Sequence, residues 1–162
     1  MRLPHRPLRL IAVGAGLVAG VSCRIGVDGS QASAIIIRVD ADPDTLVVGD
    51  STVLTVRALN PSYDTVRFET GGCDPLGIEI RTVSGDLVVP AAAGCDAGGG
   101  YVLILPTGEI RMTFVWRGER GIGAGSDPPT PVAPGVYNVR GFLNANGSPR
   151  FGTPTPVWLI AP

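Results

Sequence analysis

Apolar and polar residues alternate at period two in several short stretches of this chain, and glycine or proline interrupts most of these stretches. The clearest stretch is EIRMTFVWRG, whose apolar positions are Ile110, Met112, Phe114 and Trp116. Alternation at this period is typical of a strand with one buried face, and no apolar stripe of helical period accompanies it. With 23 glycines and 15 prolines available for turns, the sequence predicts an all-β fold.

The same alternation recurs along residues 35–162, on the predicted inward-facing residues Leu54, Val56, Ala58, Val66, Phe68, Ile78, Ile80, Tyr137, Val139 and Leu143. Glu79 is predicted to point away from the core. Asn146-Gly147 favours a tight hairpin leading into the last strand, near Trp158. Short antiparallel strands joined by turns predict an immunoglobulin-like β-sandwich. Pro154 and Pro156 cannot donate ladder hydrogen bonds, which predicts an edge position or a bulge for that last strand.

The first 22 residues have the composition of a signal peptide. Arg2, Arg6 and Arg9 precede an uncharged run, Leu10 to Val21, which contains no acidic residue. This run is shorter than the roughly 20 apolar residues that cross a bilayer as a helix. The sequence therefore predicts an export signal over residues 1–22, ahead of the folded domain.

Cys23 directly follows this signal and is a candidate lipidation site. Small Ser22 suits cleavage before a cysteine that has been acylated, although Gly20 occupies a position where such sites usually carry leucine. The alternatives are ordinary cleavage after Ser22 or at Ala32-Ser33-Ala34, which would leave Ile35 as the first residue. The first interpretation makes residues 23–34 a tether that links a lipid anchor to the domain, with several acyl chains needed for stable attachment.

Cys73 and Cys95 form an even pair in an exported chain, which predicts one disulfide in an oxidising compartment. Closing a loop of about 23 residues stabilises a fold by about 3 kcal/mol through lost chain entropy. The alternative is a pair of free, buried thiols.

Composition excludes most enzyme chemistry. The one histidine, His5, leaves with the signal, and the chain contains no lysine, so histidine-based triads, Schiff bases and histidine metal sites are absent from the mature sequence. Cleavage also removes three of the thirteen arginines and no acidic residue, which leaves a net charge of −4. We therefore expect that the protein is not an enzyme. We also expect it to bind no cofactor, metal ion, small-molecule substrate or nucleic acid.

Four segments resemble the intracellular proteinase inhibitor BsuPI domain family, an immunoglobulin-like bacterial module. They are ALNPS, VRFETGG, LPTGEIRMTFVW and APGVYNVRGFL, and they fall within roughly residues 50–145. The combination of Gly-Glu, Trp116 seven positions after that glutamate, and a later Pro-Gly-x-Tyr carries the resemblance. It implies a sandwich domain over residues 35–162 and inhibition of a protease, here with an export signal that the intracellular members lack.

A recognition loop is predicted between Arg117 and Pro134. It places charged residues on a glycine-rich half and follows them with a proline-rich half suited to an extended conformation. The candidate partner-binding residues are Arg117, Glu119, Arg120, Asp127, Pro128 and Pro129. The alternative is a tolerated surface insertion, and the segment AAAGCDAGGG around Cys95 is a second candidate loop.

These observations predict a module that binds a protein in the bacterial cell envelope, either in the periplasm or on the outer surface. A serine protease is the candidate partner. The domain would be held at the membrane by a lipid anchor, or secreted in soluble form if Cys23 is not acylated. The alternative function is a structural or assembly module without inhibitory activity. An inhibitor requires a rigid protruding loop, whereas an assembly module requires an exposed edge strand or apolar patch.

Overall fold

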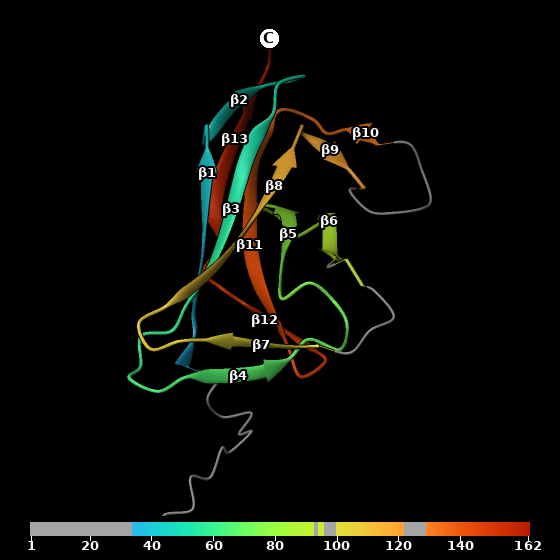
Figure 1. Ribbon diagram of the computed structural model, residues 1–162. Helices are drawn as coiled ribbons and strands as arrows, with labels where there is room; N and C mark the ends of the chain where they lie inside the picture. Colours follow the sequence, from blue (N-terminus) through green and yellow to red (C-terminus); the bar gives the residue numbers. More distant parts are fainter. Residues whose placement is uncertain (1–33, 93, 96–99, 122–128) are drawn as a thin grey trace, which may run out of the picture.

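The computed structural model describes residues 34–92, 94–95, 100–121 and 129–162, which form β-strands and their connections (Figure 1). The strands are β1 (Ile36–Asp42), β2 (Thr45–Val47), β3 (Thr52–Leu59), β4 (Val66–Glu69), β5 (Leu76–Thr82), β6 (Leu87–Ala92), β7 (Tyr101–Ile104), β8 (Glu109–Trp116), β9 (Glu119–Arg120), β10 (Thr130–Pro131), β11 (Gly135–Ala145), β12 (Ser148–Phe151) and β13 (Thr155–Ile160). The all-β prediction is confirmed.

Two sheets form the sandwich. The smaller sheet has the order β1-β3-β8, and the larger has the order β2-β13-β11-β5-β6, with β12 beside β11. The pairings described within both sheets are antiparallel, apart from β2 with β13. Two short ribbons, β4-β7 and β9-β10, extend from this frame. In Figure 1 the β4-β7 ribbon runs crosswise to the long strands, at the end where β1 begins.

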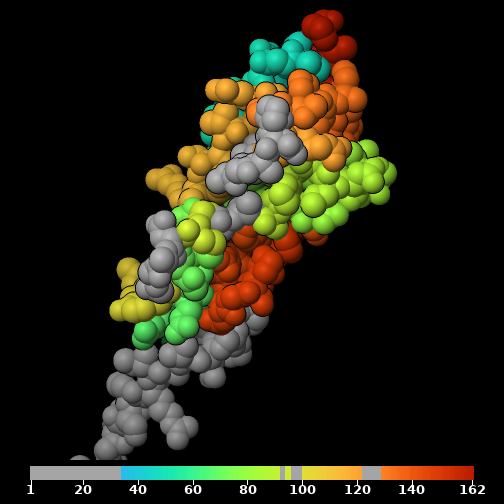
Figure 2. Space-filling view, turned by 90° about the vertical axis from the view of Figure 1, so that its right-hand side faces the viewer, coloured from blue at the N-terminus to red at the C-terminus, as the bar shows by residue number. Residues whose placement is uncertain are grey.

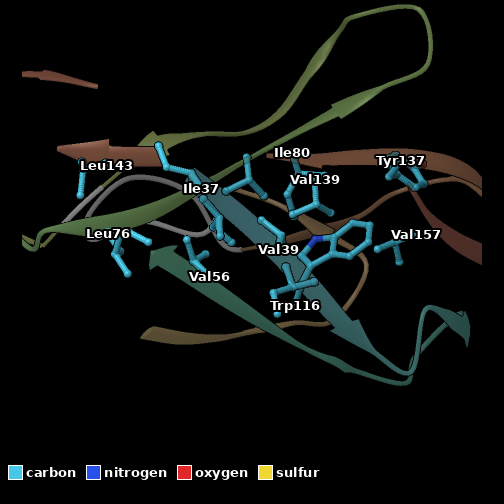
Figure 3. Close-up of a cluster of buried hydrophobic side chains, with 14 of the residues drawn as sticks. Ile37, Val39, Val56, Leu76, Ile80, Trp116, Tyr137, Val139, Leu143 and Val157 are labelled. Carbon is cyan, nitrogen blue, oxygen red and sulfur yellow. The ribbon is translucent and has the colours of Figure 1, made fainter. Parts of the chain in front are cut away.

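Alternate residues of the facing strands fill the space between the sheets. Leu54 and Val56 of β3 are fully buried, as are Val139 and Leu143 of β11. Figure 3 labels the last three of these side chains. Each such side chain contributes roughly 1.5–3 kcal/mol through burial. Gly141 lies between the latter two, and a Cβ there would stand 2.7 Å from Cγ1 of Val56. The glycine therefore permits the close approach of the two sheets.

Trp116 and Tyr137 join the two sheets towards one end of this core, opposite Leu76 and Leu143 (Figure 3). Trp116 ends β8, Tyr137 begins the long strand β11, and their rings meet edge-on with centroids 5.2 Å apart (Figure 3). The Tyr137 hydroxyl donates a 2.5 Å hydrogen bond to the carbonyl of Ala133, four residues upstream. A tyrosine near the start of a strand that bonds its own upstream backbone is the tyrosine corner of immunoglobulin-like domains. The immunoglobulin-like prediction is thus supported by a specific contact.

Asn60 connects the β3-β8 pair to the β4-β7 ribbon. Its side chain is fully buried, and its amide nitrogen donates to the carbonyls of Asp64, Ile104 and Leu105 at 2.7–3.1 Å. Its amide oxygen accepts from the backbone and hydroxyl of Ser62. A buried amide is tolerated only when its donors and acceptors are satisfied. Asn60 therefore fixes where the short ribbon leaves the sandwich.

One detail of the last strands differs from the sequence prediction. Asn146 and Gly147 form the expected turn, with φ values of 54° and 76°, but the turn leads into the short strand β12 before β13. β2 pairs with β13 only along Trp158 to Ile160, so at Pro156 β13 pairs with β11 alone among the described strands, as an edge position predicts. Pro156 pairs with β11 before β2 begins, so its missing N–H removes no bond to β2.

Candidate partner-binding surfaces

The predicted recognition loop begins on a stem that is held against the sandwich. The Trp116 indole donates to the carbonyl of Glu119 at 2.9 Å, and Nη1 of Arg120 donates to the carbonyl of Leu87 at 2.7 Å. The backbone of Gly121 donates to Val88 at 3.3 Å. Figure 2 shows the gold and orange atoms of β9 and β10 close to the light-green atoms of β6. The stem is therefore a docked hairpin.

This arrangement divides the predicted binding residues into two groups. Arg120 and Glu119 hold the stem, the first through its side chain and the second through its carbonyl. Arg117 and Pro129 are exposed. Asp127 and Pro128 lie outside the described residues, so the structure does not place the tip of the loop.

The predicted disulfide is confirmed, because the Sγ atoms of Cys73 and Cys95 are bonded. The bond joins the segment before β5 to the segment after β6, and the two cysteines also form an isolated backbone bridge. It therefore fixes the start of the AAAGCDAGGG loop to the sandwich. Cys23 and the signal peptide lie outside the described residues.

A second surface, which we call the β7 surface, consists of Arg67, Tyr101, Leu103 and Leu105. The three large side chains from β7 and the residue after it are 59%, 51% and 65% exposed. The guanidinium of Arg67 lies 4.0 Å from the centre of the Tyr101 ring. The alternate residues of the same strand face the core, where Ile104 is buried. β7 pairs only with β4 among the described strands, so one of its edges has no strand beside it.

The sequence shows the strand of the β7 surface as an apolar run, but it does not show that part of this run is exposed. YVLIL is a continuous run of apolar residues, which favours a strand buried on both faces. The strand belongs to a two-stranded ribbon instead, and its Tyr101 and Leu103 side chains are exposed. A continuous apolar run does not show which of its residues face outward, and only the tertiary arrangement exposes Tyr101 and Leu103.

A buried carboxylate lies on the outer face of the larger sheet. Glu79 was predicted to face solvent, yet it is only 4% exposed because Arg81 and Arg140 cover it. Its Oε1 accepts from Nε of Arg81 at 2.8 Å and also from the Arg140 guanidinium. The hydrogen bond from Arg81 lowers the pKa of Glu79, partly opposed by burial. A carboxylate held ionised in this way suits an ion pair rather than a proton donor.

The described residues contain neither of two features that would suggest other functions. They include no group of three or more histidine, cysteine, aspartate or glutamate side chains placed to hold a metal ion. Within the same ranges, no helix is long and apolar enough to cross a membrane.

No protein-family model matches the sequence, and no curated protein sequence matches it. Among solved structures, the chain is similar to the DNA glycosylase AlkC of Pseudomonas fluorescens (TM-score 0.47, 11% identity, covering 79% of this chain and 31% of that one). It is also similar to the CARDB domain of a Pyrococcus furiosus protein (TM-score 0.42, 14% identity, covering 78% of this chain and 87% of that one). A third similar structure is the sporulation control protein Spo0M of Bacillus subtilis (TM-score 0.45, 11% identity, covering 80% of this chain and 50% of that one). The chain therefore spans less than a third of the glycosylase.

We expect the ion pairs of Glu79 to make stability depend on pH. Because its pKa is lowered in the folded state, the stabilisation is present above the unfolded value of 4.5 and is lost as the pH falls through the folded value. Glu79→Gln should lower the free energy of unfolding by roughly 1–3 kcal/mol at pH 7, and by less with each unit below pH 4.5. Denaturant titrations at pH 7 and pH 3 measure this difference.

Glu109→Gln is the matched control, because Glu109 is exposed and has no ion pair among the described residues. It should change stability by less than about 0.5 kcal/mol at either pH. An equal effect of the two substitutions at pH 7 would contradict the role given to Glu79.

Proposed function

We propose that this chain is an exported module of the cell envelope, tethered through Cys23, that binds a protein partner through the β7 surface. The observation that carries this proposal is the exposure of Tyr101, Leu103 and Leu105 beside Arg67. Tyrosine and arginine are enriched at the energetic centres of protein interfaces, and contiguous apolar exposure is uncommon on a surface without a partner.

The position of the surface supports the same proposal. β7 leaves one edge without a neighbouring strand in the described part of the fold, and an extended segment can add to such an edge through main-chain hydrogen bonds. Disulfide Cys73–Cys95 and Asn60 hold the ribbon from its two sides. A preorganised surface loses little conformational entropy on binding, which favours affinity.

Inhibition of a serine protease is the second candidate, favoured by the docked stem of the loop between Arg117 and Pro134. A loop with a rigid base loses less entropy on entering an enzyme cleft. The resemblance to BsuPI inhibitors suggests the same function.

The β7 surface can be tested by site-specific cross-linking in intact cells. A photo-reactive residue at position 103 should form one dominant protein adduct, and Leu103→Asp should weaken binding of that purified partner at least about tenfold because it places a charge in an apolar contact. Val83 is 71% exposed on the β5–β6 turn and provides the control position. Equal adducts from positions 83 and 103 would count against this surface.

The inhibitor candidate is tested with a panel of subtilisin-like and trypsin-like proteases at micromolar concentrations of the purified chain. Inhibition that disappears when residues 121–129 are replaced by a four-residue turn, with the melting temperature unchanged, supports it. If the chain slows none of these proteases, the inhibitor candidate is rejected and the β7 surface remains the supported candidate.

The tether predicts that the mature chain starts at an acylated Cys23 and fractionates with membranes. Cys23→Ser should release the chain into the soluble fraction or leave it unprocessed, because no thiol remains to be acylated. Mass spectrometry of the purified amino terminus checks this, and a mature chain that begins at Ile35, or at an unacylated Cys23, would contradict it.

A further inference from the structure

Three arginines form a row on the outer face of the smaller sheet. In the strand register, Arg38 of β1 lies opposite Arg57 of β3, and Arg57 lies opposite Arg111 of β8. All three residues are exposed. Neighbouring strands are about 4.8 Å apart, so the row is only about 10 Å long where the side chains leave the backbone.

This row is unfavourable for the isolated fold, because like charges directly opposite one another destabilise a sheet. The middle residue has a partial remedy, since Nε of Arg57 lies 3.0 Å from Oδ2 of Asp40. Arg38 and Arg111 have no side-chain hydrogen bond or ion pair among the described residues. Two of the three positive charges therefore remain available to an external anion.

A depression of about 620 Å³ lies beside Arg38 of β1 and Arg57 of β3. Its apolar lining includes Ile36 and Leu59, and its charged lining includes Arg38 and Arg57. The carboxylates of Asp40, Asp42 and Glu109 also line it. Because these carboxylates repel anions, a bound anion would be centred on the arginine row itself.

We propose that this arginine row binds two or more phosphate groups at once, carried by one compound or by neighbouring lipid headgroups. A planar guanidinium forms paired hydrogen bonds with phosphate oxygens. A phosphate offers three acceptor oxygens and carries more negative charge than a carboxylate, so it can contact two neighbouring guanidiniums and offset the charge of both. The phosphates can belong to a free compound or to lipid headgroups, and the proposal does not depend on the function of the β7 surface.

The test uses the mature chain from residue 23 with Cys23→Ser, and inorganic tripolyphosphate as the probe. Calorimetry should detect saturable binding that weakens at least about tenfold in the double variant Arg38→Gln/Arg111→Gln, since each charged hydrogen bond is lost with its arginine. The melting temperature of the free variant should not fall, because like-charge repulsion is relieved.

The matched control compares the tripolyphosphate affinity of the Arg111→Gln variant with that of the Arg117→Gln variant. Arg117 is equally an exposed arginine, about 20 Å farther along the chain. Arg111→Gln should weaken binding of tripolyphosphate, and Arg117→Gln should leave it within twofold. Equal weakening by both variants, or no saturable binding by the unsubstituted chain, would overturn the proposal.

Vesicles distinguish the two sources of phosphate. Co-sedimentation with phosphatidylglycerol vesicles but not with phosphatidylcholine vesicles, lost in the double variant, assigns the row to lipid headgroups. Binding of tripolyphosphate without co-sedimentation assigns it to a free phosphate compound. Co-sedimentation that the double variant retains would show that the row is not the membrane contact and would overturn the lipid assignment.

Discussion

The contact between Trp116 and Tyr137 joins the two sheets and places the two ends of the 117–134 segment. Trp116 contributes a fully buried side chain from one sheet, and Tyr137 contributes the first inward side chain of the longest strand in the other. Each ring also uses its polar atom to hold a loop, through the carbonyls of Glu119 and Ala133. Apolar packing and loop position are therefore set by the same two residues.

This frame places its candidate surfaces on different parts of the domain. The β4-β7 ribbon lies at the end where β1 begins, whereas β9 and β10 lie towards the other end (Figure 1). The arginine row occupies the outer face of the sheet between them. A chain tethered before β1 would thus present the β7 surface on its tether-proximal end and the β9-β10 hairpin on its far end.

Period-two alternation was sufficient to predict the fold, because Trp116, Tyr137 and Val139 follow strand parity and are buried. The alternation did not predict the burial or position of a side chain that depends on a residue distant in the sequence. Glu79 has outward parity but is buried, because Arg140 arrives from a strand 61 residues later. The arginine row depends on the register of three strands, and no local pattern encodes that register.

We conclude that Trp116 couples the core to the base of the 117–134 segment, and amide hydrogen exchange in Trp116→Phe measures this coupling. Phenylalanine keeps an aromatic ring in the core but removes the donor to Glu119. We expect the amides of Gly121 and Val132, which bond Val88 and Gly118, to exchange at least about tenfold faster, with a smaller effect on β3 and β11. Equal acceleration throughout the sandwich, or none at these two amides, would contradict it.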